Sequence, residues 1–391
     1  MRRTHPALLA HSKEHVTMPL RIILTTGGTG GHIFPALAVA ESLKSKAPDA
    51  EILFIGGTYG PEREIVEKAD IAFVGLPVRG FIGRGLKALG ALAAMSNSIG
   101  QAMNILREFR PSAVMGFGGY ASFPTMFASW LLRYPCAIHE QNAIPGEANK
   151  LMGRMAGRIC LSWPQPASRP AFKKEKTVLT GNPIRAGIAR LGASPVPQGT
   201  SPVLLVMGGS QGARAINNMV VRMLPELRAA GIALVHQTGK NEFEAVRAGY
   251  ARLGIPDEEI SATVHPFIHD MPSVYARCSL ALCRAGATSM AELAAAGVPA
   301  VYIPFPYAAH DHQTANAQAM QDAGGGILLP QPKAEEMSGK NELAGFVLDI
   351  LKDGEALARM RMGALSMAHP DAASSVADEL LNLASSQKAD R

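Results

Sequence analysis

Cysteine is scarce in this chain, and no cysteine is spaced for metal binding. The 391 residues include four cysteines, and no two of them form a C-x-x-C pair or another zinc-ligand spacing. The pair His139-Glu140 lacks the second histidine that a metalloprotease helix carries. We therefore expect four inert thiols in a reducing compartment, no metal site and no cofactor.

Long apolar runs are lacking as well. No stretch of about 18 or more apolar residues occurs, so the sequence predicts no transmembrane helix. Residues 1–17 begin with Met-Arg-Arg and have no continuous apolar run of the kind that a signal peptide needs. We interpret 1–17 as a tail or a misassigned start ahead of the first strand.

The composition is typical of a globular protein with two domains. Hydrophobic residues make up 47% and charged residues 18%, which argues against disorder, and 391 residues are too many for one ordinary core. The net charge of +6 favours an anionic partner, either nucleic acid or acidic phospholipid headgroups. No basic stripe with interleaved aromatic residues supports nucleic acid.

Short apolar strands alternate with helical segments along the chain. RIILTT at 21–26 opens the first half and VLLVM at 203–207 the second, and a glycine-rich turn and a helix follow each. Uninterrupted apolar strands between helices are typical of parallel sheets covered on both faces. Turn-forming residues at 180–202 separate the halves, so we expect an α/β protein with two doubly wound domains. The expected divisions are a tail at 1–17, domains at 18–182 and 183–368, and a C-terminal helix at 369–391.

Two glycine-rich turns are candidate anion sites, GGTGGH at 27–32 and GGSQGAR at 208–214. Backbone N–H groups in such turns, together with the next helix N-terminus, favour a diphosphate. Neither turn fits the dinucleotide fingerprint or the P-loop. His32 is a candidate base, because a helix N-terminus lowers the pKa of an imidazole; a solvent-facing cap residue is the alternative.

Three further segments place polar side chains after expected strands, at the edge where parallel sheets bind ligands. In CRAGATSMAE at 283–292, Glu292 falls about one turn into a helix capped by Thr288 or Ser289. There it either binds ribose-like hydroxyls or completes a capping box. In DHQTAN at 311–316, amides suit sugar hydroxyls, although an exposed polar helix start is the commoner explanation. The third segment is HEQN at 139–142.

Seven strings in one order, from about residue 20 onward, resemble the MurG family of lipid II-forming N-acetylglucosaminyltransferases. They are GGTGGH at 27–32, GFGGY at 116–120, HEQN at 139–142, GNPIR at 181–185, GGSQGAR at 208–214, CRAGATSMAE at 283–292 and DHQTANA at 311–317. The resemblance implies a GT-B fold, in which two Rossmann-like domains face each other across a cleft and the last helix crosses back to the first domain. Asp-x-Asp is absent, which suits a transferase that holds the donor diphosphate with helix dipoles and side chains instead of a metal.

The resemblance also implies the reaction and its residues. N-acetylglucosamine moves with inversion from UDP-N-acetylglucosamine to O4 of the muramoyl sugar of lipid I, and a general base takes the O4 proton. His32 is the first candidate base and Glu140 the second. The implied donor-binding residues are Thr29, Gly30, Gly31, Asn142, Arg185, Ser210, Gln211, Phe267, Ile268, Met271, Arg284, Ala287, Thr288, Ser289, Glu292, Gln313 and Asn316. The implied lipid I-binding residues are Gly28, Gly118, Gly119, Tyr120 and Asn149.

Within the donor site, the resemblance gives some residues individual roles. Glu292 is expected on the ribose and Phe267-Ile268 beside the uracil. Gln313 and Asn316 are expected on the N-acetylglucosamine hydroxyls, with Asn142 reaching them from across the cleft.

Two other functions compete with this interpretation. A non-hydrolysing UDP-N-acetylglucosamine 2-epimerase would share the donor site but need no lipid patch, and GGTGGH and HEQN favour the transferase. A non-catalytic nucleotide-sugar-binding subunit would be free to lose His32 and Glu140, which are both present.

A segment at 79–89 mixes apolar and basic residues, which suits an interfacial patch on an anionic membrane leaflet. A helix buried in the domain core is the alternative. The patch residues are Arg79, Phe81, Ile82, Arg84, Leu86 and Lys87, with Trp130 and Arg133 as additions. We expect a peripheral protein on the cytoplasmic face of the bacterial inner membrane. Its expected partners are UDP-N-acetylglucosamine, lipid I, that leaflet and other cell-wall synthesis proteins, but no nucleic acid.

Overall fold

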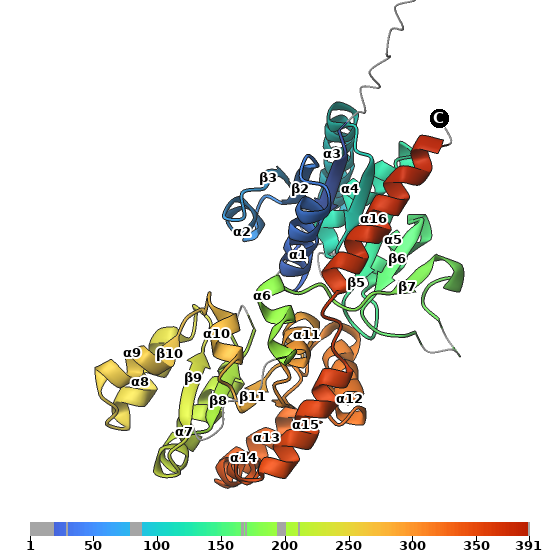
Figure 1. The fold of residues 1–391 in the computed structure, drawn as a ribbon. Coiled ribbons are helices and arrows are strands. Elements are labelled where there is room, and N and C mark those ends of the chain that lie inside the picture. Colours follow the sequence, from blue (N-terminus) through green and yellow to red (C-terminus); the bar gives the residue numbers. More distant parts are fainter. Residues whose placement is uncertain are drawn as a thin grey trace, which may run out of the picture.

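The computed structural model describes residues 19–28, 30–78, 88–165, 168, 170–193, 201–209 and 212–389. They form two parallel sheets, each with helices packed against its faces, one above the other in Figure 1. Two hydrophobic clusters accompany each sheet, one on either face.

The first sheet has the strand order β3-β2-β1-β4-β5-β6-β7, and its strands pair in parallel. In the central strand β1 (Arg21–Thr25), Ile22 and Leu24 pack on one face and Ile23 on the other. Burial on both faces explains why the strands are apolar without interruption. The other strands are β2 (Glu51–Gly57), β3 (Ala72–Leu76), β4 (Ala113–Gly116), β5 (Cys136–Glu140), β6 (Arg158–Leu161) and β7 (Thr177–Leu179). The helices of this domain are α1 (Gly30–Lys46), α2 (Glu62–Glu67), α3 (Ala88–Phe109), α4 (Phe123–Leu131) and α5 (Glu147–Met155).

The second sheet has the order β10-β9-β8-β11-β12-β13, so both sheets run outward from a first strand in the same 3-2-1-4-5 pattern. That pattern belongs to the doubly wound nucleotide-binding fold, and the expected pair of Rossmann-like domains is confirmed. The strands are β8 (Val203–Met207), β9 (Ala233–Gln237), β10 (Val264–His265), β11 (Leu280–Cys283), β12 (Ala300–Tyr302) and β13 (Gly326–Leu328). The helices are α7 (Arg214–Ala229), α8 (Phe243–Arg252), α9 (Asp257–Thr263), α10 (Met271–Tyr275), α11 (Ala287–Ala296), α12 (His312–Asp322), α13 (Gln331–Gly339), α14 (Leu343–Lys352) and α15 (Gly354–Ser366).

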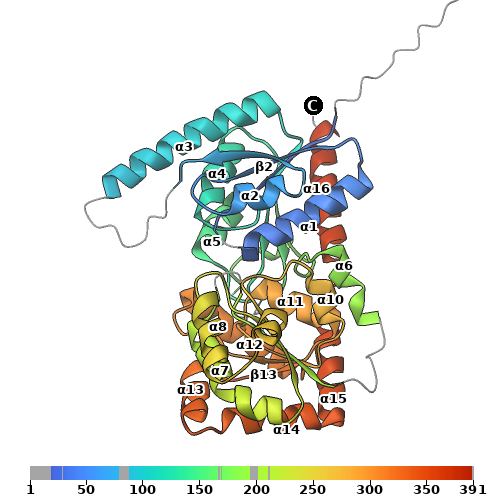
Figure 2. The same cartoon turned by 90° about the vertical axis from the view of Figure 1, so that its left-hand side faces the viewer.

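The chain crosses between the domains twice. After β7 it enters α6 (Ala186–Ala189), and Ile184 before this helix and Ile188 within it pack into the core of the second domain. At the end, α16 (Ala372–Ala389) returns to the first domain and lies beside α1 (Figures 1 and 2). Leu380 of α16 packs into the core under the first sheet, and Lys46 of α1 binds Asp378 at 2.8 Å. The two domains are therefore joined by two segments of the chain, one before α6 and one before α16.

Candidate active site

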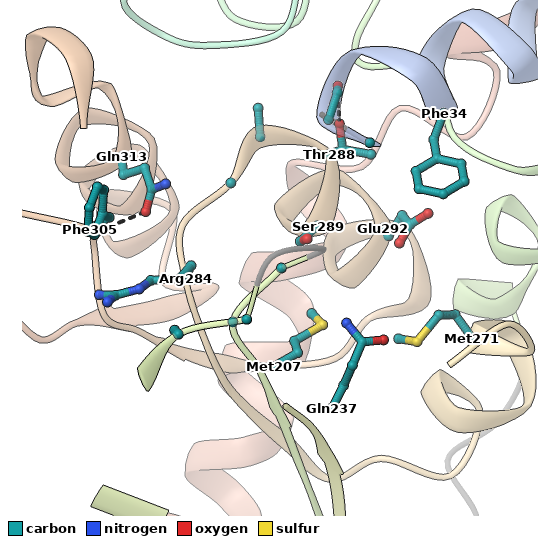
Figure 3. Close-up of a pocket in the computed structure, with 18 of the residues that line it drawn as sticks. Phe34, Met207, Gln237, Met271, Arg284, Thr288, Ser289, Glu292, Phe305 and Gln313 are labelled. Carbon is teal, nitrogen blue, oxygen red and sulfur yellow. Dashed lines mark hydrogen bonds between the residues drawn. The ribbon is translucent and has the colours of Figure 1, made fainter. Parts of the chain in front are cut away.

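A cleft of about 710 Å³ lies between the domains, where the carboxyl ends of strands from both sheets face each other. Helix N-termini and strand-end loops converge at this edge, which makes it the usual ligand site of doubly wound domains. Figure 3 shows part of its wall, with Phe34 of the first domain next to Glu292 of the second. The expected residues that line it are Gly30, Gly31, His32, Asn142, Arg185, Phe267, Ile268, Met271, Arg284, Ala287, Thr288, Ser289, Glu292 and Gln313.

His32 lies on the first turn of α1 and lines the cleft. Its Nδ1 atom is 3.1 Å from Oε1 of Gln141. Burial lowers the pKa of His32 below its ordinary value of 6.5, and His312 across the cleft lowers it further. The charge of Glu140 and hydrogen bonds to Gln141 and Phe117 oppose that decrease in pKa. The net lowering favours a neutral imidazole, the form that accepts a proton.

Glu140, the other candidate base, is buried behind the cleft and does not line it. Its Oε1 accepts hydrogen bonds from the backbone N–H of Asn142 at 2.9 Å and from the Asn142 amide at 3.3 Å. Its Oε2 accepts from the N–H of Gly146 at 3.1 Å and from Asn149 at 2.8 Å. Four donors around a buried carboxylate hold the loop at 140–149 in shape.

Glu292 joins both walls of the cleft through Arg185. Its Oε1 accepts from the guanidinium of Arg185 at 2.9 Å, and its Oε2 accepts from the hydroxyl of Tyr275 at 3.0 Å. The guanidinium lies 5.4 Å from the ring centre of Phe34 on α1. Burial raises the pKa of Glu292, while Arg185 and Tyr275 act in the opposite direction. A ligand hydroxyl at Glu292 must share the carboxylate with Arg185 and Tyr275 or displace them.

The expectation that Thr288 or Ser289 caps the helix carrying Glu292 is wrong. Helix α11 begins at Ala287 after Gly286, and no side chain caps it. Because the helix starts before Thr288, that residue falls in its first turn, and its hydroxyl donates to the carbonyl of Gly31 at 2.9 Å. The hydroxyl thus connects the second domain to the first turn of α1, which carries His32.

The opposite end of the cleft presents donors from β11 and the loop after β12. Arg284 is buried, and its Nη1 donates to the carbonyls of Ile303 and Pro304, each at 3.0 Å. Its guanidinium lies 5.4 Å from the ring centre of Phe305, and burial lowers its pKa. Gln313 Oε1 accepts the N–H of Phe305 at 2.9 Å, as Figure 3 shows, which leaves its Nε2 group for a ligand.

Asn316 is fully buried, and the structure does not bring it to the cleft surface. Its Oδ1 accepts the N–H of Ala143 in the first domain at 2.9 Å. Its Nδ2 donates to Oδ1 of Asn142 at 3.3 Å and to the carbonyl of Ala285 at 3.2 Å. These contacts fasten the domains together, whereas the resemblance implied binding of sugar hydroxyls.

The cleft also has an aromatic corner near Phe267, Ile268 and Met271. The backbone N–H of Ile268 donates to Oε1 of Gln237 at 3.0 Å, so Gln237 holds this loop against the end of β9. Aromatic and apolar side chains of this kind are typical of the lining of small-ligand pockets.

The residues expected to bind lipid I gather around the first glycine turn. Gly118 and Gly119 have φ values of +95° and +79°, which only glycine adopts without strain. A Cβ on Gly118 would lie 3.2 Å from the His32 ring, and one on Gly119 would collide with the carbonyl of Gly27. The N–H of Gly28 is already held by Oε1 of Glu62 at 2.9 Å. Tyr120 is exposed beside this turn, while Asn149 is buried against Glu140.

Several expected site residues lie outside the described residues. They are Thr29, Ser210, Gln211 and the patch residues Arg79, Phe81, Ile82, Arg84, Leu86 and Lys87. Of the expected membrane patch, the structure describes Trp130 and Arg133, which are both exposed near the end of α4; Trp130 is 49% exposed. No helix in the described part of the chain is long and apolar enough to cross a bilayer. In the same part, no three His, Cys, Asp or Glu side chains cluster closely enough to hold a metal ion.

Sequence reasoning gave no individual role to some residues that line the cleft, namely Phe34, Gln141, Gln237, Tyr275, Phe305 and His312, although Gln141 and His312 lie in the strings HEQN and DHQTAN. Gln141 and Gln237 stand at the carboxyl ends of β5 and β9, so the strand-end rule used for their neighbours would have found them. Phe34 and Tyr275 are aromatic residues on helices and carry no sequence signal that separates them from core residues.

Comparisons with known proteins agree with this geometry. The model of the glycosyltransferase family 28 N-terminal domain matches residues 22–161, and that of the family 28 C-terminal domain matches residues 203–376. A protein of Nitratidesulfovibrio vulgaris (strain DP4) is 47% identical over 93% of this chain and 97% of its own length. It is named UDP-N-acetylglucosamine–N-acetylmuramyl-(pentapeptide) pyrophosphoryl-undecaprenol N-acetylglucosamine transferase.

Two solved structures are similar to this fold. MurG of Acinetobacter baumannii superimposes with a TM-score of 0.70 and 29% identity, over 93% of this chain and 100% of that chain. The UDP-GlcNAc 2-epimerase of Neisseria meningitidis, solved with UDP-GlcNAc, has a TM-score of 0.61 and 16% identity, over 93% of this chain and 100% of that one. At that identity the epimerase shares the fold alone.

Proposed function

The chain belongs to glycosyltransferase family 28 and, within it, to the lipid II-forming N-acetylglucosamine transferases, and we propose how its cleft carries out the transfer. The enzyme moves N-acetylglucosamine from UDP-N-acetylglucosamine to the muramoyl sugar of lipid I. The observation that carries the proposal is the position of His32, which faces the donor-domain wall of the cleft from the first turn of α1.

The reaction needs a base on the acceptor side and charge stabilisation on the donor side. The O4 oxygen of the acceptor attacks C1 of the sugar, the bond from C1 to the diphosphate breaks, and UDP leaves with the electron pair. His32 takes the O4 proton, since its lowered pKa keeps the imidazole neutral near pH 7. Glu140 is a positioning residue in this scheme, because its two oxygens already serve four donors.

The second domain is suited to the leaving group without a metal. The turn at Gly208, Gly209 and Gly212 lies before α7, where N–H groups and the helix dipole favour negative charge. Arg284 adds a fixed positive charge next to that turn. Glu292 takes the ribose hydroxyls by sharing its carboxylate with Arg185, and the corner at Phe267 takes the uracil.

The first domain takes the acceptor and meets the membrane. The turn at Gly118, Gly119 and Gly28 accepts the lipid I diphosphate next to His32. Trp130 lies exposed at the end of α4, and an exposed indole suits the interface of a bilayer. We place the enzyme on the cytoplasmic face of the inner membrane on anionic lipid, with other cell-wall synthesis proteins as further partners.

The test is transfer of labelled N-acetylglucosamine from the UDP donor to a lipid I analogue in the presence of EDTA. Wild type should transfer. His32→Gln should lose roughly 10²- to 10⁴-fold in kcat, the range of a general base, and still bind UDP. Glu140→Gln serves as the matched variant, because one amide oxygen keeps part of its hydrogen bonds. A smaller loss in Glu140→Gln than in His32→Gln supports His32 as the base, and the reverse order moves the base to Glu140. No transfer by a wild type that binds UDP would refute the proposed function.

A further inference from the structure

The side chain of Gln141 links the carbonyl of Phe117 to the ring of His32. We call this link the relay, and the reaction scheme above gives it no role. Gln141 directly follows β5 and is 1% exposed. Its Nε2 donates to the carbonyl of Phe117 at 2.9 Å, and its Oε1 lies 3.1 Å from Nδ1 of His32. The indole Nε1 of Trp163 donates to the backbone carbonyl of Gln141 at 3.1 Å, which holds the main chain as well.

The direction of this relay follows from which atoms can donate. The Phe117 carbonyl only accepts, so the Gln141 atom facing it must be the amide nitrogen. The Gln141 oxygen then faces His32, and that oxygen also only accepts. Nδ1 of His32 must therefore carry the proton, which leaves the lone pair of the neutral ring on Nε2.

We propose that Gln141 is a positioning residue that fixes His32 in the tautomer protonated at Nδ1, so that Nε2 is ready to accept the proton of the attacking hydroxyl. The inference rests on the proposed role of His32 as general base. During transfer the O4–H bond breaks and its proton moves to Nε2. Positive charge then spreads over the ring, and the hydrogen bond that Nδ1–H donates to the Gln141 oxygen becomes stronger.

A neutral amide is a suitable partner for this base. A carboxylate in the same place would stabilise the imidazolium and raise the pKa of His32. The amide fixes the tautomer while burial keeps that pKa below 6.5. Charged neighbours act separately, since Glu140 raises and His312 lowers the same pKa. Gln141 thus sets which nitrogen is basic without adding a charge.

The direct test is nitrogen-15 NMR of the full chain labelled in histidine, at a pH above the range in which histidine titrates. The His32 signals are assigned by their loss in His32→Gln. Wild type should show His32 protonated at Nδ1. Gln141→Leu removes the acceptor, so His32 should shift toward the form protonated at Nε2, and kcat should fall on the order of 10²-fold with the UDP affinity unchanged.

Two further variants separate the relay from a general packing effect. Gln141→Glu keeps an acceptor oxygen for Nδ1–H, and its protonated carboxyl can donate to the Phe117 carbonyl in place of the amide. It should therefore retain the Nδ1 proton and transfer faster than Gln141→Leu. Gln165→Leu is the control. Like Gln141, Gln165 forms a hydrogen bond with the backbone, since it accepts the N–H of Phe172 at 2.8 Å, but it does not line the cleft. It should leave the His32 signals unchanged.

The outcomes distinguish this inference from the proposed function. A wild-type His32 protonated at Nε2, or an unchanged His32 tautomer in a folded Gln141→Leu, would overturn the relay. If Gln141→Leu does not fold, the wild-type tautomer and Gln141→Glu still decide. A correct tautomer in a wild type that transfers no sugar leaves the relay standing and rejects the transferase function. Full activity in His32→Gln rejects His32 as the base and, with it, the role of the relay.

Discussion

Replacing Asn316 with alanine tests whether this residue fastens the domains or reads the sugar. The amide makes two contacts to the first domain, at Ala143 and Asn142, and one within the second, at Ala285. A net contribution of about 1 kcal/mol per hydrogen bond gives about 2 kcal/mol for the two interdomain contacts. That corresponds to a fall in kcat/KM of roughly 30-fold, if catalysis requires the closed arrangement.

Asn316→Asp sharpens the same test. Its Oδ1 still accepts the Ala143 N–H, but the second carboxylate oxygen now faces the carbonyl of Ala285 and Oδ1 of Asn142. The Asn142 amide cannot turn round without cost, since its Nδ2 donates to Glu140. A buried oxygen that faces other acceptors costs more free energy than the loss of one hydrogen bond. The Asn316→Asp variant should therefore lose more activity and thermal stability than Asn316→Ala.

The assay compares steady-state transfer with calorimetric binding of UDP and of UDP-N-acetylglucosamine. Fastening predicts that Asn316→Ala changes both affinities by the same factor. A loss confined to UDP-N-acetylglucosamine, with UDP binding unchanged, would refute the reasoning and return Asn316 to the sugar. Thr314→Ala on the same helix is the control, because its hydroxyl donates to Asp311 at 2.6 Å at an exposed position within the second domain.

Two further predictions concern stability. Burial lowers the pKa of His139 to about 4 and that of His236 to about 3, so both are neutral in the folded state and take up protons on unfolding below about pH 6.5. The contribution of these two groups to stability is therefore full above about pH 6.5 and falls as pH drops, by about 3 kcal/mol per group at pH 4. Urea unfolding across that range measures this loss, and a flat profile contradicts it. In Gly181→Ala the free energy of unfolding should fall by more than the roughly 1 to 3 kcal/mol of backbone strain at φ +78°, because the new Cβ would also collide with His369. Gly254→Ala shares the strain at φ +77° with nothing within 4 Å, so equal losses in both variants would reject the collision.

The fold could be predicted because its determinants are local. RIILT at 21–25 and VLLVM at 203–207 are apolar without interruption and end in glycine turns, and both became the first strands of their sheets. Alternating residues of β1 pack on opposite faces, which is the physical reason for that pattern. The start of α11 could not be predicted this way. Thr288 has the side chain of a cap, but a carbonyl from the other domain took its hydroxyl.

The candidate site could be predicted as a list of residues but not as a set of contacts. The string HEQN contains four polar residues at one strand end, and nothing local separates their roles. The structure does so through distant partners: Gln141 bonds to Phe117 on the neighbouring strand end, and Glu140 to Asn149. Glu62 gave no sequence signal, although its carboxylate holds the N–H of Gly28 from 34 residues away. Such partners depend on strand order, which sequence spacing does not contain.

The contacts across the cleft couple the donor site to the base. Thr288, at the start of α11, donates to Gly31, which precedes His32. Asn316, on α12, bonds to Ala143 and Asn142, in the loop that Glu140 shapes. Each of these two helices of the second domain thus contacts the first domain from its own first turns: α11 contacts the start of α1, and α12 contacts the loop after β5. The hydrogen bonds of Thr288 and Asn316 hold the start of α1 and the loop after Gln141 against the second domain, and a cleft closed in this way disfavours attack by water on the donor.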